Sequence, residues 1–123
     1  MPQFGDKSKE RLSQSHPDLQ RIFNEVIKTY DCKVECGYRD KEAQERAHRD
    51  GFSKVHFPNS KHNHLPSLAV DVIPYPVDWT NVERFKELGG LVKETAEGMG
   101  IKIRWGGDFE KWKDYPHYEL KET

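Results

Sequence analysis

The sequence predicts a small α+β domain in which helices flank an antiparallel or mixed sheet. Apolar residues recur at helical spacing in two long segments of the chain. In four shorter segments they alternate with polar residues or form a brief apolar run, as they do in strands. The chain has 123 residues, enough for one domain with one modest core, so residues 1–123 are expected to form a single domain.

The first helix is predicted to follow an irregular N-terminal segment. Residues 1–14 are polar and are expected to lack regular structure. Ser15 is a candidate N-cap, Asp18 follows three residues later, and Pro17 suits the first turn. The apolar stripe of this helix consists of Leu19, Ile22, Phe23, Val26, Ile27 and Tyr30. The spacing predicts one helical face packed against the core.

A strand that contains both cysteines is predicted over residues 32–38. Its apolar side chains alternate with polar ones, and Gly37 is expected to let another backbone come close. Residues four apart on a strand share a face at a distance of about 13 Å, which is too far for a disulfide. We therefore expect Cys32 and Cys36 to be two buried thiols.

The middle of the chain predicts a short helix, a long loop and a buried strand. Asp40 is a candidate cap for a helix over 41–50. Residues 51–67 contain Gly, Pro, Asn, Ser and His without periodicity, which indicates a long loop of the kind that is often functional. The apolar run 68–73 then predicts a buried strand, interrupted only by Asp71.

A second long helix is predicted from a capping-box pattern, Thr80 to Glu83, to the region of Gly98. Gly89 and Gly90 weaken the middle of this helix, and we expect another backbone to pass close to them. Its apolar positions indicate a second helical face directed at the core.

Two further strands are predicted after that helix, over residues 101–105 and 115–120, with a loop between them. On the last strand, His117 and Glu119 share one face because side chains alternate along a strand. Tyr118 therefore faces the opposite side.

Composition excludes several classes of protein. The net charge of −1 and the lack of a Lys- and Arg-rich block argue against a nucleic-acid partner. No apolar run approaches the roughly 20 residues of a membrane span, and the first residues lack the apolar stretch of a secretory signal. We expect a monomer that is made in the cytoplasm and has no membrane partner.

Two separated stretches offer metal-binding and acid–base side chains. One contains His62, His64 and Asp71, and the other contains Asp114 and His117. Asp71 interrupts an apolar strand, and a buried carboxylate needs a partner or a metal. Two His and one Asp with an open fourth position are typical of catalytic zinc. A nearby acid that does not bind the metal can take a proton from water, so the residues predict metal-assisted hydrolysis.

These residues resemble a known group of enzymes. Ser60-Lys61-His62, Ala69-Val70-Asp71 and Asp114-x-x-His117, in this order, are similar to zinc peptidases of the D-Ala-D-Ala carboxypeptidase (VanY-like) type. Residues 37–40 resemble the Gly-x-Arg turn of that family, and residues 72–79 resemble its phage-type members, the L-alanyl-D-glutamate endopeptidases. The resemblance covers roughly residues 30–120 and implies a hedgehog-like zinc peptidase fold.

The resemblance implies a role for each matching residue. His62, Asp71 and His117 would bind Zn²⁺, Asp114 would be the general base, and Arg39 would stabilise the developing oxyanion or hold a substrate carboxylate.

One departure from the family pattern leaves two candidates for the first ligand. The family places that His seven residues before the Asp, where this chain has His64. His62 instead keeps the Ser-x-His motif and stands nine residues before Asp71, as if the turn contained a two-residue insertion. We expect His62 to be the ligand, with His64 as the alternative.

The implied function is hydrolysis of peptidoglycan stem peptides by an L-alanyl-D-glutamate endopeptidase, acting as a phage or prophage endolysin. Such an enzyme would reach the cell wall through a holin pore. The alternatives are a D-Ala-D-Ala carboxypeptidase or dipeptidase, and a non-catalytic zinc-binding module of the same fold. A nuclease built on His62-Asn63-His64 is a further alternative, but it calls for a basic surface.

Overall fold

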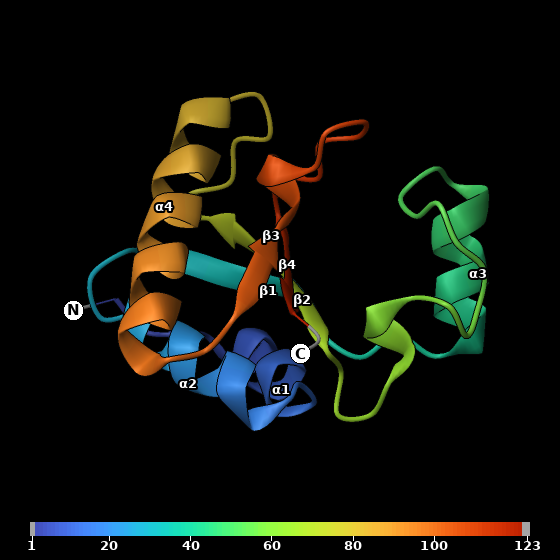
Figure 1. Cartoon of the computed structure of the whole chain (residues 1–123), viewed down its shortest axis with the longest axis horizontal. Coiled ribbons are helices and arrows are strands. Elements are labelled where there is room, and N and C mark those ends of the chain that lie inside the picture. The colour runs from blue at the N-terminus through green and yellow to red at the C-terminus, as the bar shows by residue number, and fades with distance from the viewer. Residues whose placement is uncertain (1, 122–123) are drawn as a thin grey trace.

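The computed structural model describes residues 2–121 as an antiparallel sheet with helices on both sides (Figure 1). The four strands lie in the order β1-β2-β4-β3, and all three pairings are antiparallel. The strands are β1 (Cys32–Cys36), β2 (Ala69–Pro74), β3 (Ile103–Trp105) and β4 (His117–Leu120). The α-helices are α1 (Asp6–Ser13), α2 (Pro17–Val26), α3 (Lys41–Arg49) and α4 (Val82–Met99). The predicted α+β class is therefore confirmed, and the sheet is antiparallel rather than mixed.

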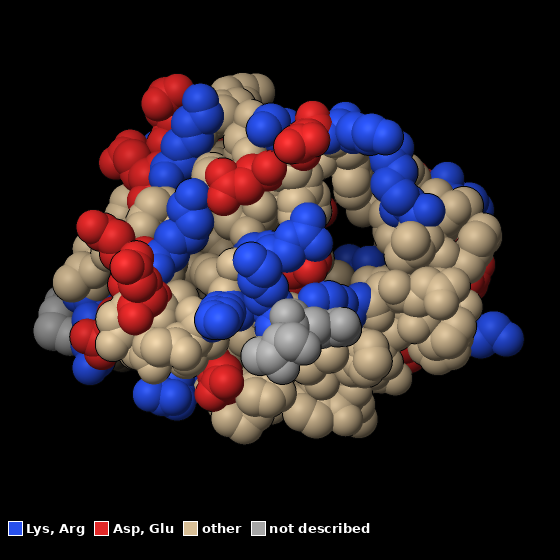
Figure 2. Space-filling view, viewed as in Figure 1, with Lys and Arg blue, Asp and Glu red and all other residues tan. Residues whose placement is uncertain are grey.

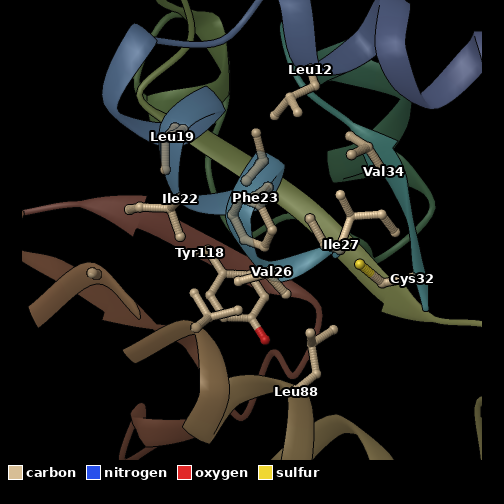
Figure 3. Packing of buried hydrophobic residues seen from close by; sticks show 14 of the residues in the cluster. Leu12, Leu19, Ile22, Phe23, Val26, Ile27, Cys32, Val34, Leu88 and Tyr118 are labelled. Carbon is tan, nitrogen blue, oxygen red and sulfur yellow. The ribbon is translucent and has the colours of Figure 1, made fainter. Parts of the chain in front are cut away.

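The hydrophobic core lies between one face of the sheet and the helices α1, α2 and α4 (Figure 3). Phe23 of α2 meets Tyr118 of β4 edge to face, with ring centroids 5.3 Å apart. Val70 and Val72 of β2 face the same core. Because side chains alternate along a strand, Asp71, between these two valines, points to the opposite face of the sheet. Helix α3 lies on that other side (Figure 1).

The N-terminal segment departs from the prediction, because residues expected to be irregular form α1. Only Ser8 and Leu12 of this helix are buried, so the sequence has no apolar stripe that would predict it. Ser8 accepts a hydrogen bond from the backbone N–H of Val34, which attaches α1 to β1. Close packing here depends on Gly37, where a Cβ would collide with the carbonyl oxygen of Arg11. The predicted close approach at Gly37 is therefore confirmed.

Two of the predicted helix caps are shifted by one residue. The N-cap of α2 is His16, whose Nδ1 accepts from the N–H of Asp18, and not Ser15. The N-cap of α4 is Asn81, not Thr80. Asp40 caps α3 as predicted, accepting from the N–H of Ala43. An imidazole or an amide can satisfy the first orphan N–H groups of a helix just as the neighbouring hydroxyl could.

The glycine pair in α4 has a different role from the one predicted. A Cβ on Gly89 would come within 2.7 Å of Cε2 of Trp105, whereas one on Gly90 would meet nothing within 4 Å. A side chain of β3, rather than another backbone, therefore occupies the space. The helix ends at Gly100, which has a φ of 72° and so takes a conformation that suits glycine.

The prediction that both cysteines are buried is wrong for Cys36. Cys32 is buried, but Cys36 is partly exposed. The register of β1 against β2 shifts between Val34 and Cys36, and a bulge of this kind redirects the side chains beyond it. Cys36 thereby comes opposite Asp71 on β2.

Within residues 2–121, no helix is long and apolar enough to cross a membrane.

Candidate metal centre and active site

The register of the sheet brings together two of the predicted site residues. Asp71 of β2 and His117 of β4 are direct partners across the two strands. Oδ1 of Asp71 lies 3.3 Å from Nδ1 of His117. Both side chains lie on the face of the sheet that is turned away from the core.

His62 reaches the same carboxylate oxygen from the loop before β2. It belongs to a 3₁₀ turn (Lys61–Asn63) that is capped by the hydroxyl of Ser60. The turn is fixed to the strand-to-helix connection, because the N–H of Arg39 donates to the carbonyl of His62 at 2.8 Å. Nε2 of His62 lies 3.3 Å from Oδ1 of Asp71, and the imidazole is buried.

The outer nitrogens of both imidazoles have partners that fix their orientation. Nδ1 of His62 donates to the carbonyl of Gly37 at 2.8 Å, and Nε2 of His117 donates to Oε1 of Glu119 at 2.7 Å. These contacts leave Nε2 of His62 and Nδ1 of His117 facing Oδ1 of Asp71. Hydrogen bonds of this kind to the far nitrogen are characteristic of metal-binding histidines.

The two contacts between an imidazole nitrogen and Oδ1 of Asp71 have the spacing expected around a divalent cation. Oδ1 of Asp71 is buried and makes no aligned hydrogen bond in the described part of the chain. Atoms bound tetrahedrally to zinc at ~2.0–2.1 Å lie ~3.3 Å from one another, which matches both contacts to Asp71. The donor set of two imidazole nitrogens and one carboxylate oxygen suits zinc.

Protons compete for the same atoms. Burial lowers the pKa of His62, but the Asp71 carboxylate outweighs burial and raises that pKa to about 10. Burial raises the pKa of Asp71, and the two histidines outweigh it and hold that pKa far below its ordinary value. The metal-free cluster is therefore an ion pair at neutral pH, and a cation has to displace protons from it.

Asp114 lies beside the cluster as a carboxylate without a strong partner. Its Oδ2 is 4.0 Å from Nδ1 of His117. Burial, followed by repulsion from Asp71, raises the pKa of Asp114 to about 6. A carboxyl group with a pKa near neutrality can both accept and return a proton.

Arg39 brings a cation to the other oxygen of Asp71. Its Nη2 lies 3.5 Å from Oδ2 of Asp71, and its Nη1 donates to Oε1 of Gln44 at 3.0 Å. Gln44 is fully buried on α3 and therefore holds the guanidinium in place. Arg39 also lines the cleft that holds the cluster.

Cys36 is a neighbour that the sequence did not indicate. Its Sγ lies 3.8 Å from Nδ1 of His62, and Cys36, His62 and Asp71 could together hold a metal ion. The sulfur approaches Nδ1 of His62, the nitrogen that is hydrogen-bonded to the carbonyl of Gly37. His117 is the other candidate for the third ligand, because its Nδ1 lies 3.3 Å from Oδ1 of Asp71.

The remaining histidines lie outside the cluster. His64 is exposed and is not part of the cleft lining found within the described residues. His56 pairs with Glu45 at 2.7 Å and lies against His48, with ring centroids 3.8 Å apart. His16 caps α2.

The cluster lies in a cleft of about 990 Å³ between the sheet and the part of the chain that contains α3. Figure 2 shows the molecule hollowed at this position. Besides the cluster, the cleft is lined by the aromatic side chains Phe52, Trp79, Phe85, Phe109, Trp112 and Tyr115. Lys54 of one wall lies over the ring of Trp112 on the other, 5.0 Å from its centroid. The volume suits a peptide segment.

The fold and the cluster define a small α+β domain of the hydrolase type, with candidate acid–base groups and candidate metal ligands in one cleft. A family model described as phage L-alanyl-D-glutamate peptidase matches residues 1–123. The chain belongs to this family.

Individual relatives agree with the family model. The chain is 29% identical, over 123 residues, to the L-alanyl-D-glutamate peptidase of Escherichia phage T5, covering 96% of this chain and 88% of the relative. The crystal structure of the Serratia marcescens L-Ala D-Glu endopeptidase ChiX is similar with a TM-score of 0.82 and 30% identity, covering 97% of this chain and 90% of ChiX.

A more distant structure shares the fold. The vancomycin resistance D,D-pentapeptidase VanY from a VanB-type cassette, solved in complex with Zn(II), has a TM-score of 0.58 and 19% identity and covers 89% of this chain and 70% of VanY. At this identity the likeness shows the fold alone. Together, these comparisons confirm the expected family, fold and class of activity, that of a peptidase.

Proposed function

We propose that this chain is a zinc-dependent L-alanyl-D-glutamate endopeptidase that cuts peptidoglycan stem peptides, with His62, Asp71 and His117 as the zinc ligands. The observation that carries the ligand assignment is the convergence of two oriented imidazole nitrogens on the buried Oδ1 of Asp71, each at 3.3 Å. The relatives named as L-alanyl-D-glutamate peptidases support the choice of substrate.

The residues of the cleft divide the work of peptide hydrolysis. His62, Asp71 and His117 would hold a zinc ion, which would supply Lewis-acid chemistry for hydrolysis. Asp114 accepts the proton of the attacking water and returns it to the leaving amine. Arg39 directs its N–H groups at the carbonyl oxygen as charge develops there. The carbonyl of Gly37 and the carboxylate of Glu119 hold the imidazoles of His62 and His117 in their orientation.

The site of action follows from the substrate. We propose that the protein acts on the cell wall as an endolysin, after release from the cytoplasm through a holin pore. The cleft and its catalytic groups lie in the one domain described here. We also propose that the protein works as a monomer, since each candidate ligand and both catalytic candidates come from the same chain.

Digestion of purified peptidoglycan by the zinc-loaded protein tests this function. Mass spectrometry of the products should show new N-terminal D-Glu, and the Asp114→Asn variant should release far less of it in the same time. Release of terminal D-Ala would instead support the carboxypeptidase alternative. A protein that binds zinc and releases no product would support the non-catalytic module.

A further inference from the structure

Trp79 is a large aromatic residue in an unusually open position. Its side chain is 56% exposed, yet it lines the cleft that holds the candidate active site. The indole is stacked on Phe85 of α4, with ring centroids 5.7 Å apart and planes inclined by 26°. One face of the indole is thus supported by the protein, and the other face is directed to solvent.

The segment that carries Trp79 is held in place on both sides of it. Oδ1 of Asp78 accepts hydrogen bonds from the N–H and the hydroxyl of Thr80, at 3.1 Å and 2.7 Å. The guanidinium of Arg84 on α4 donates to the carbonyl of Pro76 at 2.6 Å. A ring presented by a fixed segment loses little conformational entropy when a ligand binds.

A row of aromatic rings connects Trp79 with the catalytic groups. Phe85 is followed by Tyr115, with centroids 6.3 Å apart, and Tyr115 adjoins Asp114 in the chain. Figure 1 shows the connection from β2 to α4 and the segment between β3 and β4 at the same end of the molecule. Trp79 is thus the exposed end of a row that begins beside the general base.

The proposed substrate requires a binding surface at this distance. In a stem peptide, L-alanine is joined through its amino group to the lactyl group of a muramic acid, so the bond after L-alanine is one residue from a sugar. An extended residue spans ~3.3–3.6 Å, so the sugar lies on the order of 10 Å from the reacting carbonyl. Two ring-to-ring steps of the aromatic row have that scale. The C–H face of a sugar with equatorial substituents packs well on an indole, because the electron-rich ring attracts the polarised C–H groups.

We propose that Trp79 is the sugar-binding platform of the cleft, on which the glycan strand that carries the stem peptide rests. This inference rests on the proposed function, because it takes the stem peptide to be the occupant of the cleft. It assigns the solvent face of Trp79 to an uncharged pyranose ring.

Binding of a peptide-free glycan tests the platform without catalysis. The probe is a tetrasaccharide of alternating N-acetylglucosamine and N-acetylmuramic acid, titrated into zinc-loaded protein and followed by the NMR signals of the indole N–H groups. Trp79→Ala should weaken binding at least tenfold, and Trp79→Phe should weaken it less. The matched control is Tyr75→Ala, since Tyr75 is 53% exposed and lines a separate hollow. Equal affinity of the wild type and Trp79→Ala would overturn the proposal, as would loss of binding only in Tyr75→Ala.

Kinetics on two substrates separate this inference from the proposed function. One substrate is a muramyl stem peptide and the other is the same peptide with an acetyl group in place of the sugar. Trp79→Ala should lower kcat/KM at least tenfold for the muramyl peptide and less than twofold for the acetyl peptide. An equal loss on both substrates would overturn the sugar assignment. Glycan binding through Trp79 without cleavage of either peptide would overturn the proposed function alone. Trp79-dependent binding to phosphatidylglycerol vesicles, without glycan binding, would make the platform a membrane contact.

Discussion

Asp71 and His117 face each other across β2 and β4, with Oδ1 of the carboxylate 3.3 Å from Nδ1 of the imidazole. The relationship follows from the antiparallel register, so it is as fixed as the sheet itself. His62 is the one candidate ligand that a loop supplies, and its loop is attached to the turn at Arg39 by backbone hydrogen bonding. Two rigid groups and one restrained group thus define the centre of the site.

The Asp114 carboxylate should be needed for turnover but not for metal binding. Asp114→Asn preserves the size of the side chain and removes the base, so kcat should fall by roughly 10²–10⁴-fold. Burial and repulsion from Asp71 raise the pKa of Asp114 to about 6, so the wild-type rate should fall as the pH decreases through about 6. A bound cation favours the carboxylate and would move this fall to a somewhat lower pH. Steady-state rates from pH 4 to 8, with zinc content measured in parallel, check both statements. Full activity of Asp114→Asn would exclude this residue as the base.

The strands, helices and caps that a local sequence pattern encodes could be predicted from the sequence. The apolar run interrupted by Asp71 and the alternation around Tyr118 located β2 and β4, and with them two candidate ligands. Asp40 was found because its capping interaction is local. The predicted class left the sheet antiparallel or mixed, and the structure shows that β2 and β4 pair antiparallel.

The unpredicted features depend on contacts between distant segments. Helix α1 has only two buried residues, Ser8 and Leu12, so no periodic stripe indicates it. Cys36 reaches the site because the register of β1 shifts. The alternation of apolar and polar residues in this strand does not indicate a bulge. The sequence alone does not indicate that Trp79 is exposed at the cleft, because its exposure depends on the fold.

The metal-free protein should become less stable as the pH rises above neutrality. The folded pKa of His62 is raised to about 10, above its unfolded value of about 6.5. The ion pair with Asp71 therefore contributes its full stability below about pH 6.5 and loses it as the pH rises through about 10. Thermal unfolding of the chelator-treated protein from pH 6 to 10 should show this decline, and His62→Gln should show a smaller one. Identical slopes for the two proteins would contradict the assignment.

Glu119 should act through His117 on metal affinity. Its Oε1 accepts from Nε2 of His117 at 2.7 Å, and Lys61 lies 3.2 Å from its Oε2. Glu119→Ala removes the group that orients the imidazole, which typically weakens metal binding by about 10–100-fold. Competition titration with a zinc chelator measures the change. Glu35→Ala is the control because Glu35 also lines the cleft but pairs with Lys33, and it should bind zinc like the wild type.

Gly106 should be intolerant of a side chain because of its contact with Asp114, the proposed general base. A Cβ on Gly106 would collide with the carbonyl oxygen of Asp114. The backbone N–H of Asp114 donates to the carbonyl of Gly106 at 3.0 Å. Gly106→Ala should lower stability by about 1–3 kcal/mol, as overpacking does, and should reduce kcat by displacing Asp114. Gly90→Ala has open space and should stabilise α4 by up to about 1 kcal/mol. Denaturant unfolding compares the two variants, and equal effects would contradict the packing argument.

The most direct test is the metal content of three purified variants, measured after equilibration with zinc and removal of the excess. His62→Ala and His117→Ala should each lose the bound zinc ion, because each removes a nitrogen that faces Oδ1 of Asp71. His64→Ala should keep one zinc per chain, since that side chain is exposed and outside the cleft lining. Loss of zinc in His64→Ala together with full retention in His62→Ala would contradict the account of the site.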